Sequence, residues 1–140
     1  MNFTANNNQP VVLVVDDDQD NLLLIGYQVS LLAACSVISA SNGNTALTMA
    51  QQFQPSLILL DVMLPDVDGL EVMRRLKQDP QTHHIPIVAV SAIAQTREIE
   101  RAIKAGFDDY LIKPYELESL ELLINRYLCG SHLYPIEVSP

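Results

Sequence analysis

The chain has 140 residues, of which 49% are apolar, and a formal net charge of −9 with only eight lysines and arginines. This length suits a single domain with its own core, and so few scattered cations argue against direct binding of nucleic acid, which depends on clustered basic residues. No apolar run approaches the roughly 20 residues that cross a bilayer, and residues 1–9 lack the pattern of a secretory signal, so we expect a cytoplasmic protein without membrane contact.

The predicted elements alternate between strands and helices. Val11–Val15 is a β-branched run that ends abruptly at three aspartates, as expected of a strand buried on both faces of a parallel sheet. The other predicted strands are Val37–Ala40, Leu57–Leu60, Ile85–Val90 and Tyr110–Ile112. The predicted helices cover roughly residues 20–34, 45–53, 70–78, 96–105 and 116–128.

Five strands that alternate with five helices predict an α/β domain, doubly wound about a five-stranded parallel sheet with right-handed crossovers. We place this domain at residues 10–129. It is expected to lie between a disordered N-terminal segment, residues 1–9, and a loose C-terminal tail, residues 130–140.

Reactive polar residues end four of the five predicted strands: Asp16 with Asp17, Asp61, Ser91 and Lys113. The carboxyl ends of parallel strands meet at one edge of the sheet, where ligands bind. Clustered carboxylates repel one another unless a cation lies among them, and oxygen ligands suit Mg²⁺. Asp61 could then act as a nucleophile that forms an aspartyl phosphate, with the Lys113 ammonium neutralising charge on the opposite side.

Four segments around these residues resemble the receiver domains of bacterial two-component response regulators. They are Val12–Asp18, Leu57–Gly69, Val88–Ala92 and Ala105–Pro114, and the spacings between them also resemble those of the family. The resemblance covers roughly residues 10–129. It implies a stand-alone, chemotaxis-receiver-like protein with a flavodoxin-like sheet of strand order 2-1-3-4-5.

The resemblance also implies a role for each residue at the strand ends. Asp61 would be the phospho-acceptor, assisted by Lys113 and Ser91. Ser91 and Tyr110 would form a conformational switch that responds to the phosphoryl group. The peptide bond between Lys113 and Pro114 would be cis.

A magnesium ion is the cofactor that the resemblance implies. Its ligands would be the carboxylates of Asp16, Asp17 and Asp61 and the backbone carbonyl of Met63.

The function implied by the resemblance is that of a single-domain response regulator. It would accept a phosphoryl group from a sensor histidine kinase or a histidine phosphotransfer protein, and signal to an unknown downstream protein by a conformational change. It would not be a metabolic enzyme, since it would catalyse only its own phosphorylation and dephosphorylation, and it would be a monomer or a weak dimer.

Three alternatives remain at this point. A small aspartyl-phosphate hydrolase would turn over phosphoesters. A degenerate receiver used only for protein interaction would lack a site residue, whereas every one is present here. A receiver cut from a longer regulator or hybrid kinase is compatible with the sequence.

The first predicted helix carries two apolar stripes. The stripe expected to face the sheet consists of Leu24, Ile25, Gln28, Val29 and Leu32. The opposite stripe consists of Leu23, Tyr27 and Leu31, with Leu22 nearby. Since receivers commonly dock this helix against the helical bundle of a kinase or phosphotransfer protein, we expect the second stripe to be a docking face. The alternative is that a terminal segment of the chain covers it.

Other motifs favour structural roles. Residues 66–69 superficially resemble the nucleophile motif of haloacid-dehalogenase-type phosphatases, but they follow a loop, so a turn before the next helix is expected. Asp18 is expected to cap a helix rather than to lie in the outer shell of a metal. His83 and His84 lack further ligands, and Cys35 and Cys129 match no metal or redox spacing.

Overall fold

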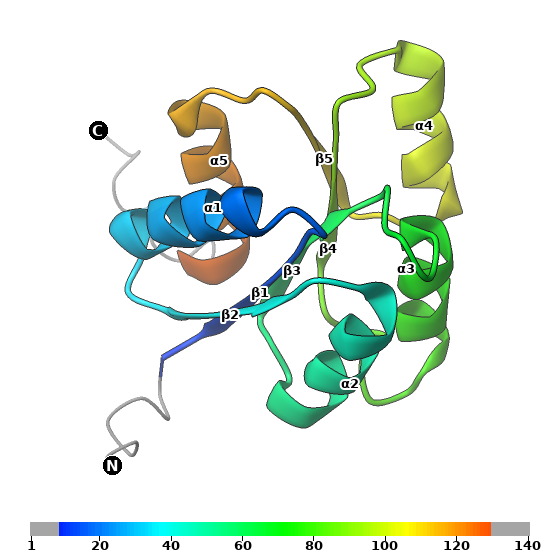
Figure 1. Cartoon of the computed structure of the whole chain (residues 1–140), viewed down its shortest axis with the longest axis horizontal. Coiled ribbons are helices and arrows are strands. Elements are labelled where there is room, and N and C mark those ends of the chain that lie inside the picture. The colour runs from blue at the N-terminus through cyan, green and yellow to red at the C-terminus, as the bar shows by residue number, and fades with distance from the viewer. Residues whose placement is uncertain (1–8, 130–140) are drawn as a thin grey trace, which may run out of the picture.

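The structure is a computed structural model that describes residues 9–129, in which parallel strands alternate with helices (Figure 1). The strands are β1 Val11–Val15, β2 Ser36–Ala40, β3 Leu57–Asp61, β4 Ile87–Ser91 and β5 Asp109–Ile112. The helices are α1 Gln19–Leu32, α2 Gly43–Phe53, α3 Gly69–Gln78, α4 Thr96–Ala105 and α5 Leu117–Ile124, which continues as a π-helical turn, Asn125–Cys129. The predicted tail at 130–140 and all but the last residue of the predicted segment at 1–9 lie outside the described residues. Within the described part of the chain, no helix is long and apolar enough to cross a membrane.

The five strands form one parallel sheet in the order β2-β1-β3-β4-β5, which confirms the predicted order. Helices α1 and α5 cover one face, and α2, α3 and α4 cover the other (Figure 1). The chain passes from β1 to β2 on one side and then from β2 back across β1 to β3 on the other side, so the sheet has its switch point between β1 and β3. A crevice at the carboxyl ends of these two strands is where a doubly wound sheet binds ligands.

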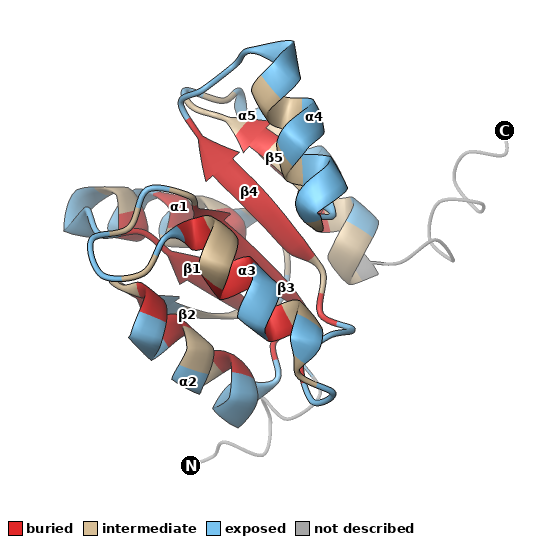
Figure 2. Cartoon of the chain, turned by 90° about the vertical axis from the view of Figure 1, so that its right-hand side faces the viewer, coloured by how far each residue is buried: buried red, intermediate tan, exposed pale blue. Residues whose placement is uncertain are grey.

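Each face of the sheet has its own apolar core. Leu13 and Ile58 belong to the cluster under α2 and α3, whereas Val14 and Leu59 belong to the cluster under α1 and α5. Successive residues of a strand point to opposite faces, which is why continuous apolar runs are needed here. Figure 2 shows the strands as buried and the outer helix surfaces as exposed. Each fully buried leucine or isoleucine contributes about 1.5–3 kcal/mol to the stability of the folded state, so these cores hold the strand ends firmly in place.

The orientation of α1 differs from the prediction. Leu22, Ile25 and Val29 face the sheet, so including Leu22 in an exposed docking face was wrong. The prediction that Leu24 faces the sheet was also wrong, since Leu24 is 54% exposed. Adjacent residues of a helix lie about 100° apart around its axis. Because the two apolar stripes overlap, their pattern did not fix the rotation of α1 about its axis to better than that angle. The remaining residues of the second stripe are exposed: Leu23 by 73%, Tyr27 by 63% and Leu31 by 62%.

Strand β4 begins two residues later than predicted. The Ile85 N–H donates to the Thr82 carbonyl at 3.0 Å, which closes a turn, and Pro86 has no N–H to give to a neighbouring strand. The apolar character of Ile85 reflects burial in the core rather than membership of the strand.

Gly69 permits the close approach of α3 to the end of β3. An added Cβ would lie 2.5 Å from Val62 Cα and 2.8 Å from the Asp61 carbonyl oxygen, both backbone atoms. We therefore expect Gly69→Ala to lower the free energy of unfolding by about 2 kcal/mol, as overpacking does. Gly26→Ala is the control, because its Cβ would meet only Val37 Cγ1, at 3.6 Å, within a helix. Urea unfolding should show Gly26→Ala as neutral or stabilising, and equal destabilisation of both variants would contradict the explanation.

Candidate functional site

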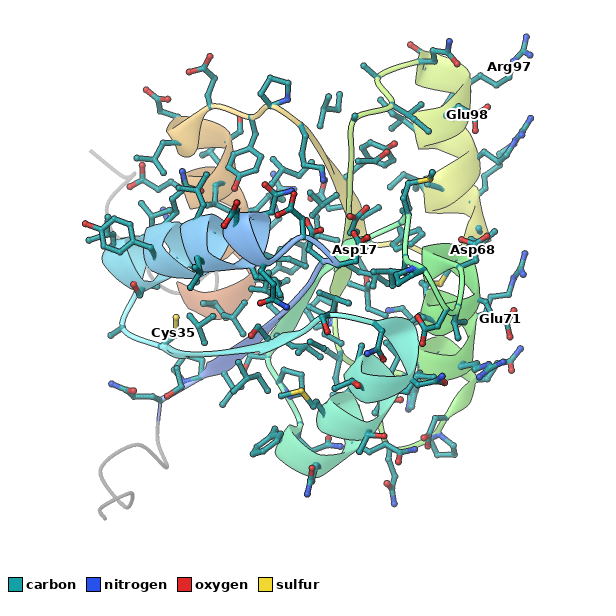
Figure 3. All side chains as sticks on the ribbon, in the orientation of Figure 1. Asp17, Cys35, Asp68, Glu71, Arg97 and Glu98 are labelled. Carbon is teal, nitrogen blue, oxygen red and sulfur yellow. The ribbon has the colours of Figure 1, made fainter. Side chains whose placement is uncertain are left out.

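The switch point brings three carboxylates together. Val15 of β1 pairs with Leu60 of β3, so the aspartates that follow them, Asp16 and Asp61, lie at the same level of the sheet. Asp16, Asp17 and Asp61 each offer one carboxylate oxygen, and these oxygens lie within 4.8 Å of one another. Asp16 and Asp61 are only 7% and 6% exposed, whereas Asp17 is exposed beside the loop that leads to α3 (Figure 3).

Backbone contacts fix the orientation of Asp16. Its N–H donates to the Ala40 carbonyl at 3.1 Å, and its Oδ1 accepts from the Asp18 N–H at 2.9 Å. The Asp18 side chain in turn accepts from the N–H groups of Asp20 and Asn21, at 2.9 and 3.3 Å. This is the cap of α1, as expected for Asp18.

Asp61 is held in a similar way and faces a cation. Its Oδ1 accepts from the Met63 N–H at 2.9 Å. The Lys113 Nζ lies 3.7 Å from Oδ2 of Asp61 and 3.7 Å from Oδ2 of Asp16. These distances are too long for hydrogen bonds, so Lys113 acts on both carboxylates as a shared point charge. The Lys113–Pro114 bond is cis, as expected.

Burial raises the pKa of Asp61 above its ordinary value. The Met63 N–H and the Lys113 ammonium act in the opposite direction, and the nearby Asp16 adds to the rise in pKa. Three carboxylates thus gather at the ends of two buried strands, with one ammonium shared between two of them. A hard divalent cation with carboxylate ligands would remove this imbalance, so the residues present fit a metal such as Mg²⁺.

Ser91 and Tyr110 both contact the backbone of Ile93, in the loop after β4. The Ser91 Oγ accepts from the Ile93 N–H at 3.1 Å, and Ser91 is buried. The Tyr110 hydroxyl donates to the Ile93 carbonyl at 2.9 Å. The two predicted switch residues therefore hold the same residue, Ser91 through the N–H of Ile93 and Tyr110 through its carbonyl.

Beside the site, a largely apolar groove separates α1 from the loop before α5. Asp16, Lys113 and the exposed Leu24 are among the residues that line it. The Tyr115 hydroxyl donates to Gln28 Oε1 at 2.8 Å across the groove, and burial raises the pKa of Tyr115. This pair has no signal in the sequence, because the two residues are far apart in the chain and neither belongs to a motif.

The motif at residues 66–69 serves as a turn, as predicted. Asp68 caps α3 by accepting from the Leu70 N–H at 3.1 Å, and it lies where α3 begins (Figure 3). Asp66 instead contacts the start of α2, a role that was not predicted from the sequence.

The other motifs behave as ordinary surface or packing groups. His83 and His84 contact one another edge to face, with ring centroids 5.9 Å apart. Cys35 packs against the core under α1, and burial raises the pKa of its thiol. Cys129 ends the π-helical turn, and its side chain lies outside the described part of the structure.

Comparison with known proteins gives consistent matches. A family model described as the response regulator receiver domain matches residues 12–125. The polar-differentiation response regulator DivK of Brucella anthropi is 41% identical over 91 residues, which cover 65% of this chain and 74% of DivK. The transcriptional regulator RpaA of Synechocystis is 38% identical over 100 residues; these cover 71% of this chain but only 38% of RpaA.

A solved structure with the same fold contains a metal. The receiver domain of the sensor histidine kinase PA1611 of Pseudomonas aeruginosa was solved with a magnesium ion coordinated in its active site cleft. It is 27% identical, with a TM-score of 0.78, and the match covers 87% of this chain and 99% of that one.

Because the pKa of Asp61 is raised, the negative charge of Asp61 should destabilise the native state of the metal-free protein. A group whose native pKa exceeds its unfolded value stabilises the native state below the unfolded pKa, and this contribution is lost as the pH rises through the native pKa. Asparagine can still accept from the Met63 N–H but carries no charge. We therefore expect Asp61→Asn to raise the free energy of unfolding by about 1 kcal/mol at neutral pH without divalent cations.

Urea unfolding over a range of pH measures this effect. The difference between Asp61→Asn and wild type should disappear well below the unfolded aspartate pKa of about 3.9. Glu100→Gln is the control, since the exposed Glu100 lies on α4, outside the carboxylate group, and its substitution should change stability little. A difference for Asp61→Asn that does not vary with pH would contradict the prediction.

Proposed function

The chain belongs to the response regulator receiver family, and on that basis we propose that it accepts a phosphoryl group on Asp61 from a histidine of a partner protein. The observation that carries this proposal is the group of three carboxylates with Lys113 at the switch point of the sheet. The proposal includes Mg²⁺ as the cofactor and a cytoplasmic location, both as expected from the sequence.

The chemistry would depend on positioning and charge. Oδ1 of Asp61 is engaged by the Met63 N–H, so Oδ2, on the side of Lys113, is the oxygen available to attack phosphorus. As the bond from Oδ2 to phosphorus forms, the bond from phosphorus to the donor imidazole nitrogen breaks. The imidazole keeps that electron pair and takes a proton from water. Lys113 would stabilise charge on the phosphoryl oxygens.

Mg²⁺ bound by Asp16, Asp17, Asp61 and the Met63 carbonyl would neutralise part of the charge on the phosphoryl group. The protein would catalyse only its own phosphorylation and dephosphorylation, so its product is a signal rather than a metabolite.

The switch would run through the loop after β4. A phosphoryl group on Asp61 offers a new acceptor to the Ser91 hydroxyl, which now accepts from the Ile93 N–H. Movement of Ser91 toward it would release Ile93, and Tyr110 would lose its acceptor on the same residue. This is a shift between two packings of one fold. An unknown downstream protein would read it, without direct contact to nucleic acid or membrane.

A kinase or phosphotransfer protein would dock on α1. Leu23, Tyr27 and Leu31 form an exposed apolar face that runs along α1 from about its first turn to its last. An apolar face of this kind on one helix suits packing against the helices of another protein. We propose that the protein is a monomer or a weak dimer.

Acetyl phosphate provides the direct test of phosphorylation. Wild type incubated with acetyl phosphate and Mg²⁺ should gain one phosphoryl group in intact mass, and Asp61→Asn should gain none because it lacks the nucleophilic oxygen. Adding a chelator should abolish the gain in wild type. An unmodified wild type, or a phosphorylated Asp61→Asn, would overturn the assignment.

Docking can be separated from chemistry. Replacing Leu23 and Tyr27 together by serine should slow phosphotransfer from the cognate donor roughly tenfold or more, since interface anchors carry about 1–2 kcal/mol each. The rate with acetyl phosphate should stay unchanged, because neither side chain touches the site. A matched control is Phe53→Ser, which alters an exposed apolar residue on α2, on the other face of the sheet. Equal losses with both donors would argue against the docking face.

A further inference from the structure

Asp66 joins two segments that flank the site but are distant in the chain. It lies in the loop between β3 and α3, and its carboxylate accepts from two N–H groups at the start of α2. Oδ1 accepts from Gly43 at 2.8 Å and Oδ2 accepts from Asn44 at 3.0 Å. The first turn of α2 has no acid of its own, so Asp66 supplies the negative charge that a helix N-terminus favours.

Two further observations show that this contact is tight. The N–H groups of Gly43 and Asn44 lower the pKa of Asp66, with Gly43 the larger cause. A Cβ on Gly43 would lie 2.9 Å from Val67 Cβ and 2.8 Å from Val72 Cγ2, so the loop and α3 press directly on the start of α2. The two segments already pack closely, and the bidentate contact fixes their position relative to each other.

One of the tied segments is the loop that carries Met63. The Val62 N–H donates to the Val90 carbonyl of β4 at 3.3 Å, at the start of this loop. The next hydrogen bonds are local: the Met63 N–H donates to Asp61, and the Gly69 N–H donates to the Val62 carbonyl at 3.1 Å. Within residues 62–68, the hydrogen bonds of Asp66 are the ones that reach a different helix.

The other tied segment borders Asp16. The Asp16 N–H donates to the Ala40 carbonyl at the end of β2, and only two residues separate Ala40 from Gly43. Asp66 thus connects the loop on one side of the carboxylate group to the turn that supports Asp16 on the other side.

We infer that Asp66 is a positioning residue that fixes the spacing between the Met63 backbone and the carboxylates of Asp16 and Asp17. Asp66 would touch neither metal nor phosphoryl group. It would act by preventing the loop after Asp61 from drifting away from β1, so that the ligands are in place before a cation arrives. This inference rests on the proposed function, since it names a residue that supports the same site.

The chain contains a matched control at the far end of α2. Asp79, at the end of α3, accepts from Gln51 Nε2 of α2 at 2.7 Å and from the Gln81 N–H at 2.9 Å. Like Asp66, it ties α2 to the α3 side through a carboxylate. Gln51 and Gly43 are eight residues apart, or about 12 Å along the helix, so Asp79 lies away from the carboxylates.

The test compares Asp66→Ala with Asp79→Ala in the full chain. Both should lower the urea midpoint slightly. Only Asp66→Ala should weaken Mg²⁺ binding in calorimetric titration, by about tenfold, the lower end of the effect of residues that support metal ligands. Phosphorylation by acetyl phosphate at subsaturating Mg²⁺ should slow in parallel. Asp66→Asn, which keeps one acceptor oxygen, should give an intermediate affinity.

A second measurement needs neither metal nor phosphate. In metal-free protein, the Met63 amide should exchange its hydrogen faster in Asp66→Ala than in wild type, and at the wild-type rate in Asp79→Ala. Equal behaviour of the two alanine variants in Mg²⁺ affinity and in Met63 exchange would overturn this inference while leaving the proposed function intact. A wild type that neither binds Mg²⁺ nor gains a phosphoryl group would overturn both.

Discussion

The parallel register of β1 and β3 is the constraint on which the rest of the structure depends. It places Asp16 and Asp61 side by side at the carboxyl ends of two buried strands, with Asp17 next to them. Buried carboxylates are costly unless paired, and here Lys113 is shared between two of them. The site therefore carries unbalanced negative charge at the ends of two buried strands, and the proposed divalent cation and phosphoryl group would bind there without rearranging the sheet.

The segments around this site differ in how firmly they are held. The loop after β3 is fixed by Asp66, Gly69 and the hydrogen bond from Met63 to Asp61. The segment after β4 is held through Ile93, and α4 beyond it has no buried residue. Elements with little buried apolar area move at low cost. In the proposed function, the site would thus keep the residues that hold the metal in place while passing a change to α4 and β5.

Much of the fold could be predicted from the sequence because its signals are local. Apolar runs that end on Asp16, Asp61 and Ser91 indicate buried parallel strands, and Gly106 marks the end of α4. The acid cluster followed from the same runs, since all parallel strands end at one edge. The rotation of α1 did not follow, because Leu22, Leu23 and Leu24 are equally apolar and only packing against the sheet selects Leu22 for burial.

By itself, the sequence determined the order of the elements and which polar residues gather at the strand ends, because each of these strands carries its polar residue at its own end. Only the tertiary structure decided the contacts between segments: Asp66 with the start of α2, Tyr115 with Gln28, and both Ser91 and Tyr110 with Ile93. Such pairs have no periodicity or spacing that a sequence displays. They arise from the distance and direction in which neighbouring elements pack, which are set once the whole chain has folded.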